Sequence, residues 1–334
     1  MRVSVVIPVY NEATQIAATI RSVTEALLET ETFRDAEIIV ADDGSSDDSG
    51  PTAERAATAV PVRVARLAVN EGKFAARRAG LEAATGSYVL LLDNGVLVVP
   101  GSLAYLESEL ERDPEAEVWN AHTVMDTGSS AVARFWEVVQ DIAFAAYQDD
   151  PRRTSFGADD FDRFPKGTTL FFAPRGLVVE AYDAFTSLYD DLRHSSDDTA
   201  LIRWIAERRR INIGPDFACV YRPRTSVSSF FQHSIVRGVH FPDSFRSPTS
   251  RFFWPMIAFY PVTAALCVAA LRRPLVVPAA AAAVSTVSAA TVVARRRPLG
   301  DVLAVAALAP VYALGHGIGM WQGAVTIARQ RLRR

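Results

Sequence analysis

Polar side chains follow three apolar segments in the N-terminal third of the chain, at the point where each segment ends. The three groups are Tyr10-Asn11-Glu12, Asp42-Asp43 and Asp93-Asn94. Carboxylates in such positions can accept hydrogen bonds, ligate a hard cation or take up a proton. An ordinary turn or helix cap is the alternative for each group taken alone.

Two basic residues, Lys73 and Arg77, lie at the start of a predicted helix that follows Asn70-Glu71-Gly72. Residues four positions apart share one face of a helix, so both charges can point the same way. The N-terminus of a helix also favours an anion such as a diphosphate. A solvated basic face is the alternative.

The elements that must position these residues alternate between strands and helices. The expected strands are Val3–Val9, Glu37–Ala41, Val62–Leu67 and Ser87–Leu92, and the expected helices are 11–28, Ser49–Ala59 and Lys73–Ala84. The continuous apolar strands are typical of a parallel sheet covered on both faces. This order predicts an α/β fold with a doubly wound, mostly parallel sheet, in which ligands bind at the carboxyl ends of the strands.

The composition excludes some classes of protein. A formal net charge of -3, with no basic stripe interleaved with aromatic residues, argues against nucleic acid as a partner. The two cysteines, Cys219 and Cys267, lie far apart, match no metal-binding spacing and suit a reducing compartment. The chain opens directly as a strand, without a signal-like segment, so the catalytic part is expected in the cytoplasm.

Charge nearly disappears from Phe252 to Trp321, and three apolar segments lie there at about 252–271, 274–294 and 299–321. Each is close to the ~20 residues that a helix needs to cross a bilayer. We therefore expect a first domain over 1–240, which carries the polar groups described above, and a membrane domain over 241–334.

The number of membrane crossings is open. Three crossings from a cytoplasmic start place the basic C-terminal tail outside, against the positive-inside rule. Alternatively, the first apolar segment lies in the membrane–water interface, where its aromatic residues fit. The other two segments then cross the membrane and return the basic tail to the cytoplasm, but they place Arg295-Arg296-Arg297 outside. Neither arrangement satisfies the rule fully, and we favour the second.

The ordered set of motifs resembles a family 2 glycosyltransferase of the inverting, A-type fold. The motifs are Val5-Val6-Ile7-Pro8-Val9-Tyr10-Asn11-Glu12, Asp42-Asp43-Gly44-Ser45-Ser46-Asp47, Asn70-Glu71-Gly72 with Arg77 and Gly80, Asp93, Lys166-Gly167-Thr168-Thr169, Asp197-Asp198, and Gln232 with Arg237-Gly238. Each motif alone is weakly specific, whereas their order over about 1–240 is strongly specific.

The resemblance implies a site for a nucleotide-diphospho-sugar, linked to UDP, GDP or dTDP. Asp43 then corresponds to the residue that hydrogen-bonds the base, and Pro8, Val9 and Glu12 to its neighbours. The full set of implied donor-binding residues is Pro8, Val9, Glu12, Asp43, Lys73, Arg77, Asp93, Asn94 and Arg222.

Two departures from the family pattern concern the metal. Family members carry Asp-x-Asp after the fourth strand, and its second carboxylate ligates a divalent cation; here the chain reads Asp93-Asn94-Gly95. Arg222, or Tyr221 if the alignment shifts by one residue, stands near the place of a histidine that also approaches the metal in the family. Mg²⁺ or Mn²⁺ is still expected, with Asp93 as its ligand. The alternative hypothesis is that Arg222, with Lys73 or Arg77, partly replaces the cation.

The acceptor side is implied by three further motifs. Gly167 and Thr168 correspond to a segment that lines the acceptor cleft, and Asp198 to the general base, with Asp197 beside it. An N-cap of the following helix is the alternative for either aspartate. Gln232 and Arg237 resemble part of a family element that holds polysaccharide chains, but its Trp is absent. That absence favours transfer of a single sugar over processive synthesis.

The membrane segments imply an acceptor that is a lipid or a lipid-linked glycan, with a polyprenyl phosphate as the leading candidate. The expected location is the cell membrane, with the catalytic domain on the cytoplasmic face. A membrane-anchored binding or regulatory protein with a decayed transferase site is the alternative. Gly95 favours this alternative, whereas Asp43, Asp93 and Asp198 together argue against it.

Overall fold

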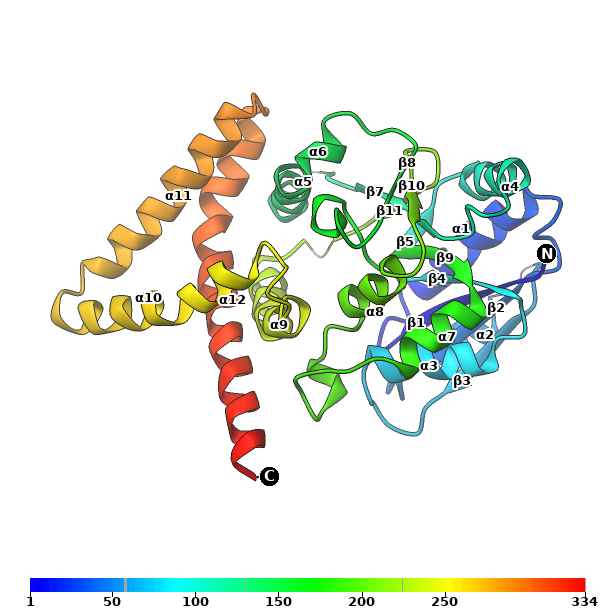
Figure 1. Ribbon diagram of the computed structural model, residues 1–334, viewed down its shortest axis with the longest axis horizontal. Coiled ribbons are helices and arrows are strands. Elements are labelled where there is room, and N and C mark those ends of the chain that lie inside the picture. Colours follow the sequence, from blue (N-terminus) through cyan, green and yellow to red (C-terminus); the bar gives the residue numbers. More distant parts are fainter. Residues whose placement is uncertain (57–58, 129, 224, 334) are drawn as a thin grey trace. The chain divides into compact units, whose positions relative to one another are not determined.

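A computed structural model describes residues 1–56, 59–128, 130–223 and 225–333, without the side chain of Asp197. The chain forms two compact units. The sheet unit comprises Met1–Val124, Phe144–Thr186 and Asp197–Arg222, and the helical unit comprises Met125–Ala143, Ser187–Ser196 and Pro223–Arg334. Figure 1 shows the elements of both units.

The sheet unit is built on an eight-stranded sheet in the order β3-β2-β1-β4-β9-β6-β10-β8. A second sheet has the order β5-β11-β7. The strands are β1 Val3–Val9, β2 Glu37–Asp42, β3 Val62–Arg66, β4 Tyr88–Leu92, β5 Val96–Val98, β6 Trp119–Asn120, β7 His122–Met125, β8 Thr154–Phe156, β9 Leu170–Pro174, β10 Ile211–Ile213 and β11 Ala218–Tyr221.

The first half of the large sheet is parallel, which confirms the fold class expected from the sequence. β1 pairs in parallel with β2 and β4, and β2 pairs in parallel with β3. Every residue of β1 is buried, as its uniformly apolar sequence predicts. β9 enters antiparallel between β4 and β6, which brings a segment from the second half of the chain beside the strands that end in carboxylates.

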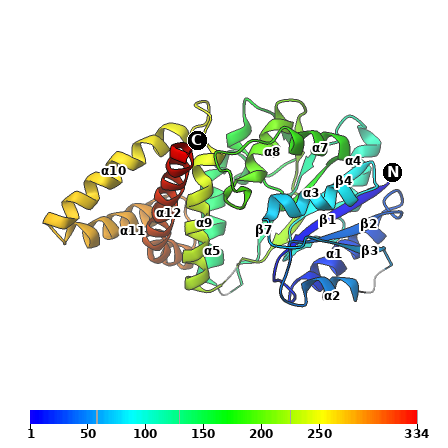
Figure 2. The same ribbon diagram turned by 90° about the horizontal axis from the view of Figure 1, so that it is seen from below.

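Helices cover both faces of this sheet. The helices are α1 Ile16–Leu28, α2 Ser49–Glu54, α3 Lys73–Ala83, α4 Ser102–Arg112, α6 Ala145–Gln148, α7 Arg175–Asp183 and α8 Asp197–Ala206, with 3-10 turns Phe161–Arg163 and, in the helical unit, Leu192–His194. α3 lies on one face, and α1 and α2 lie on the other (Figure 2).

Two predicted helix boundaries were wrong. α1 begins at Ile16 and not at residue 11, because Asn11 takes a positive φ of 52°. α2 ends at Glu54, well before the predicted end at Ala59. Ala57 and Thr58, which the prediction also covered, lie outside the described residues.

A buried carboxylate joins the amino ends of the central strands. Glu37 accepts hydrogen bonds from Ser4 Oγ at 2.7 Å and from the amide of Thr85 at 2.8 Å, and Arg63 contacts its other oxygen. Burial alone would raise the pKa of Glu37, but the hydrogen bonds from Thr85, Ser4 and Arg63 outweigh burial and lower it from 4.5 to about 2.

This carboxylate makes a testable contribution to acid stability. Its pKa is lower in the folded than in the unfolded state, so its contribution is complete above pH 4.5 and is lost as the pH falls towards about 2. Glu37→Gln is expected to flatten this part of the dependence of unfolding free energy on pH, measured by urea titration in detergent. Glu54→Gln, an exposed change on α2, is the control, and equal slopes for both variants would contradict the prediction.

The helical unit contains the three apolar segments as helices α10 Phe253–Arg272, α11 Val276–Ala294 and α12 Leu299–Arg333, together with α5 Ala131–Ala143 and α9 Val227–Ser244. All three apolar helices are long and apolar enough to cross a membrane. Only 6% of the most apolar stretch of α10 or α11 is buried, against 33% for α12. α10 and α11 form a hairpin that diverges from α12 towards the Arg273–Leu275 turn (Figures 1 and 2).

α12 packs against α9 through glycines. Gly315, Gly319 and Gly323 recur at every fourth position of α12 and are buried. A Cβ at Gly319 would lie 2.0 Å from the Ile235 carbonyl oxygen, and one at Gly238 would lie 2.1 Å from the His316 carbonyl oxygen. Such small residues allow two helix backbones to approach closely. Residue 240 lies inside α9, so the helical unit begins before the boundary expected from the sequence. The expected division at residue 240 into a catalytic and a membrane domain stays a prediction.

An ionic cluster fixes the turn between α11 and α12 to α5. Arg297 lies 2.7 Å from Glu137, 2.8 Å from Asp141 and 3.0 Å from Asp301, and Arg134 also contacts buried Asp301. The chain joins α5 to the sheet unit at both ends. This turn is therefore attached to α5, and the number of membrane crossings stays a prediction.

Candidate functional site

Hydrogen bonds join the loops that follow β1 and β2. The amide of Asn11 donates to Ser45 Oγ at 3.0 Å, and the amide of Ser46 donates to Asn11 Oδ1 at 2.8 Å. The amide of Glu12 donates to Ser49 Oγ at 2.8 Å. These contacts place Glu12 beside the loop that begins at Asp43.

Pro8 and Val9 are buried at the carboxyl end of β1, where they pair with Ala41 and Asp42 of β2. They therefore help to shape the sheet edge below the two loops. Their contact with a nucleotide base stays a prediction.

Asp43 holds the segment that leads into α3. Its two carboxylate oxygens accept hydrogen bonds from the amides of Glu71 and Gly72 at 2.8 and 2.9 Å. Gly72 has a φ of 95°, which a glycine adopts without strain. Burial raises the pKa of Asp43 above its ordinary value, and the two amide hydrogen bonds oppose the rise. The predicted contact of Asp43 with the base would have to use the remaining lone pairs of this carboxylate.

Asp93, immediately after β4, binds both predicted basic residues. Lys73 Nζ lies 2.9 Å from one carboxylate oxygen, and the guanidinium of Arg77 lies 2.7 Å from the other. Burial acts to raise the pKa of Asp93, but the charges of Lys73 and Arg77 outweigh it and lower the pKa. Arg77 is fully buried, whereas the Lys73 side chain is 49% exposed. The two cations therefore lie together at the carboxyl end of β4, as their four-residue spacing on a helix predicted.

The segment that precedes β9 lies beside Asp93. The amide of Asp93 donates to the Thr169 carbonyl at 3.0 Å, so Gly167 and Thr168 adjoin the same strand end. Two buried atoms here, Asn94 Oδ1 and Thr168 Oγ1, have no hydrogen-bond partner among the described residues. Buried polar atoms are normally paired, so two such atoms mark a place for a ligand or water.

Asn120 positions this segment, and no sequence motif predicted that role. Its Oδ1 accepts a hydrogen bond from the amide of Gly167 at 3.1 Å, and its Nδ2 donates to the Ala121 carbonyl at 3.0 Å. Asn120 is buried at the end of β6, which pairs with β9. The signal in the sequence that could have identified Asn120 is its position as a polar residue directly after Trp119.

Gly95, at the place of the missing carboxylate, has a backbone that disfavours any other residue. Its φ is 79°, its amide donates to Thr19 Oγ1 at 3.0 Å, and an added Cβ would lie 2.3 Å from Gln15 Oε1. Among the residues with described side chains, no three His, Cys, Asp or Glu side chains gather as they would around a metal ion. Asp93 therefore offers a cation one carboxylate that already faces two positive charges.

Arg222 leaves the small sheet next to this position. β11 pairs antiparallel with β5, and Tyr221 lies opposite Val96. The residue after Tyr221 therefore emerges beside Gly95. The strand pairing thus brings Arg222 to the same end of the sheets as Asp93.

Asp198 lies in the first turn of α8, and its Oδ1 accepts a hydrogen bond from the amide of Thr199 at 2.7 Å. Later in the same helix, Arg203 lies 3.0 Å from Asp162, in the loop that continues to Lys166 and the acceptor segment. This ion pair attaches α8 to the segment that contains Gly167. The side chain of Asp197 lies outside the described structure, and the catalytic role of Asp198 stays a prediction.

Gln232 and Arg237 belong to the other compact unit, on α9. The guanidinium of Arg237 lies over the Trp136 ring at 4.2 Å, and Gln232 is exposed. Arg237 therefore has a packing partner in its own unit. The predicted acceptor contacts of both residues stay predictions.

Residues 4–150 match the model of Glycosyl transferase family 2. They form a family 2 glycosyltransferase domain. Over 112 residues the chain is 38% identical to the undecaprenyl-phosphate 4-deoxy-4-formamido-L-arabinose transferase of Pseudomonas fluorescens, covering 33% of this chain and 32% of that protein. It is 39% identical over 100 residues to the uncharacterized glycosyltransferase YibD of Escherichia coli, covering 30% and 27%. The chain thus spans about a third of the length of these curated relatives.

Solved structures show the A-type fold of the family 2 domain. TarS of S. aureus in complex with UDP matches with a TM-score of 0.52 and 16% identity, over 100% of this chain and 92% of that one. The mannosyltransferase PcManGT of Pyrobaculum calidifontis, in complex with GDP-Man and Mn²⁺, matches with a TM-score of 0.51 and 21% identity, over 99% and 87%. At these identities the likeness establishes the fold alone.

Proposed function

We propose that this protein transfers a single sugar from a nucleotide-diphospho-sugar to a membrane-linked acceptor, with inversion at the anomeric carbon. The observation that carries the proposal is the cationic pair Lys73 and Arg77, held by Asp93 at the carboxyl end of a central strand of a family 2 domain. Ligands of doubly wound sheets bind at this edge.

The donor lies across the strand ends in this proposal. Its base, uracil, guanine or thymine, contacts Asp43 with Pro8, Val9 and Glu12 nearby. Its diphosphate faces Lys73 and Arg222, and the buried Arg77 adds positive charge beside Asp93. Fixed positive charges that are already in place stabilise the diphosphate as it leaves, because they need no reorganisation during the reaction. Asn94 and Thr168 offer buried oxygens to the sugar or its diphosphate.

Transfer occurs in one displacement. An acceptor oxygen attacks the anomeric carbon, the bond from that carbon to the diphosphate breaks, and the electron pair leaves with the nucleotide. Asp198 takes the proton of the attacking acceptor oxygen, as a general base, whether that oxygen belongs to a sugar hydroxyl or to the P–O–H group of a singly protonated lipid phosphate. Asp93 is the residue that would hold Mg²⁺ or Mn²⁺, which would add positive charge near the leaving diphosphate.

The helical unit determines which acceptor the protein meets. Ion pairs keep the Arg295–Arg297 turn beside α5, so we propose that the α10–α11 hairpin enters the bilayer and returns to the same side. Most arginines of the helical unit then stay with the sheet unit on the cytoplasmic face, as the positive-inside rule requires, and only Arg272 and Arg273 are exported. A lipid acceptor such as a polyprenyl phosphate fits this placement, and the P. fluorescens relative is named for one.

Asp198→Asn provides the test of this function. Purified full-length protein is assayed with UDP-, GDP- and dTDP-sugars and a polyprenyl phosphate, with Mn²⁺ and in EDTA. We expect transfer from one nucleotide class, lowered about 100-fold or more by Asp198→Asn because a general base is removed. Nucleotide binding should be unchanged.

The matched control is Asp159→Asn, which changes an exposed carboxylate of the same unit and should leave the rate unchanged. A membrane-anchored binding protein with a decayed site would bind a nucleotide and transfer nothing with any donor. That outcome, with folded protein, would replace the transferase proposal.

A further inference from the structure

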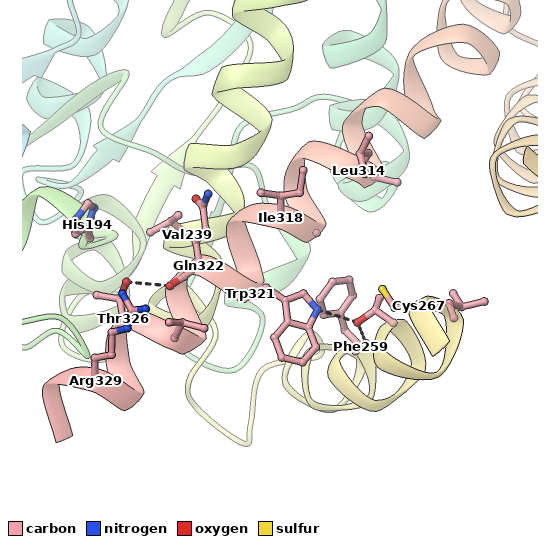
Figure 3. Close-up of a pocket in the computed structure, with 15 residues that line it drawn as sticks. His194, Val239, Phe259, Cys267, Leu314, Ile318, Trp321, Gln322, Thr326 and Arg329 are labelled. Carbon is pink, nitrogen blue, oxygen red and sulfur yellow. Dashed lines mark hydrogen bonds between the residues drawn. The ribbon is translucent and has the colours of Figure 1, made fainter. Parts of the chain in front are cut away.

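A cavity of about 770 Å³ lies within the helical unit, between α9, α10, α12 and the turn before α8 (Figure 3). This volume is within the range of ~300–1,000 Å³ that is usual for small-molecule sites. The lining residues are His194, Val239, Phe259, Thr263, Leu266, Cys267, Ala313, Leu314, Gly317, Ile318, Trp321, Gln322, Val325, Thr326 and Arg329. None of them belongs to the sheet unit.

Most of the cavity wall is apolar and aromatic. Phe259 packs against Gly317, where an added Cβ would lie 3.4 Å from its ring, and Trp321 stacks edge-on against Tyr260. The indole nitrogen of Trp321 donates to Thr263 Oγ1 at 3.0 Å. Because the indole nitrogen is already hydrogen-bonded to Thr263, this part of the wall presents mainly apolar surface, which suits a hydrocarbon chain.

The polar groups gather at the other end. Figure 3 shows His194, Thr326 and Arg329 at one end of the cavity, away from Phe259 and Cys267. The Thr326 hydroxyl donates to the Gln322 carbonyl at 2.9 Å, which leaves Arg329 as the charged group of this end. Among the described ion pairs, none involves Arg329, and this exposed guanidinium can bind an anion.

We propose that this cavity binds the acceptor as a lipid phosphate, with the phosphate at Arg329 and His194 and the first part of its single apolar chain along Ile318, Trp321 and Phe259. The combination of one cationic end with one apolar wall matches a long-chain phosphate monoester in both charge and polarity. The cavity lies between α10 and α12, two helices that are long and apolar enough to cross a membrane, so membrane lipid can reach it. The naming of this lipid as the acceptor rests on the proposed function.

The free thiol of Cys267 gives a readout that is independent of sugar transfer. Cys267 is exposed and lines the cavity, whereas Cys219 is buried, so N-ethylmaleimide should react at Cys267. We expect a polyprenyl phosphate, added to full-length protein in detergent, to slow this alkylation. At a lipid concentration of ten times Kd the rate should fall about tenfold, because only the unliganded protein reacts.

Two variants and two lipids locate the binding site. Arg329→Gln should raise the polyprenyl phosphate concentration needed for protection by about tenfold, the usual value of one charge-assisted contact. Arg331→Gln removes an arginine of the same helix that does not line the cavity and should change nothing. The uncharged polyprenol should protect less than the phosphate, and phosphatidylglycerol should not protect.

Equal protection by the polyprenol would overturn the phosphate assignment, and equal protection by phosphatidylglycerol would show a site for bulk phospholipid instead of the acceptor. Absence of protection by any lipid would overturn the site altogether. Transfer is measured separately on the same protein. Transfer without protection would overturn the cavity alone, and protection without transfer would overturn the proposed function alone.

Discussion

Asp93→Asn is expected to lower sugar transfer by about 100-fold or more, comparable to the loss of one preorganised electrostatic contact in an active site. The carboxylate of Asp93 holds both Lys73 Nζ, at 2.9 Å, and the buried guanidinium of Arg77, at 2.7 Å. Without its charge the two cations repel each other, and Arg77 becomes a buried charge without its compensating acid. Removal of one partner from a buried pair typically costs ~3–5 kcal/mol, so the melting temperature should also fall.

A matched change at Asp183 of α7, which pairs with the neighbouring arginine of α3, separates this effect from a general loss of ion pairs. Asp183→Asn removes one of two acidic partners of Arg78, which lies next to Arg77 on α3 and forms exposed pairs with Asp183 at 3.2 Å and with Glu82 at 3.3 Å. Exposed pairs contribute ~0–1 kcal/mol, so both stability and transfer should stay close to those of the unchanged protein. Equal transfer rates for the two variants would contradict the role given to Asp93.

Gly319→Leu is expected to separate α12 from α9 and to destabilise the helical unit by about 3 kcal/mol or more, at the upper end of overpacking effects. The atom that an added Cβ would meet, at 2.0 Å, is the carbonyl oxygen of Ile235, and backbone cannot move aside as a flexible side chain can. The measurement is the melting temperature of the full chain in detergent, with the yield of monodisperse protein as a second readout.

Gly317→Ala is the control on the same helix. Its Cβ would lie 3.4 Å from the Phe259 ring, near ordinary contact distance, and alanine is favoured over glycine in a helix by up to ~1 kcal/mol. The control should therefore melt within a few degrees of the unchanged protein. If Gly319→Leu melts like Gly317→Ala, the close packing of α9 and α12 is not what stabilises this unit.

The parallel half of the sheet was predictable because its information is local. Val3–Val9 is a continuous apolar run, and such runs are expected where both faces of a strand are covered. The positions of Asp43, Asp93 and Lys73 followed from the ends of these elements. The antiparallel insertion of β9 was not predictable in the same way, since pairing of Leu92 with Leu170 depends on residues far apart in the sequence.

The membrane part shows the same limit. Length and composition predicted three apolar helices, but Arg297 counted only as a positive charge near a predicted crossing. Its partners Glu137 and Asp141 lie about 160 residues earlier in the chain, so the sequence pattern around Arg297 could not reveal them. The four-residue spacing of Gly315, Gly319 and Gly323 is visible in the sequence and predicts a close helix contact, although not the identity of the partner helix.

The central claim is that the strand ends around Asp43 and Asp93 bind the diphosphate of a nucleotide sugar. Titration calorimetry of the purified full chain with UDP, GDP and dTDP tests this claim most directly. We predict saturable binding of one nucleotide class at one site per chain, weakened at least tenfold by Lys73→Ala, which removes a charged contact to the diphosphate. Folded protein that binds none of the three nucleotides, or binds one equally well without Lys73, would contradict it.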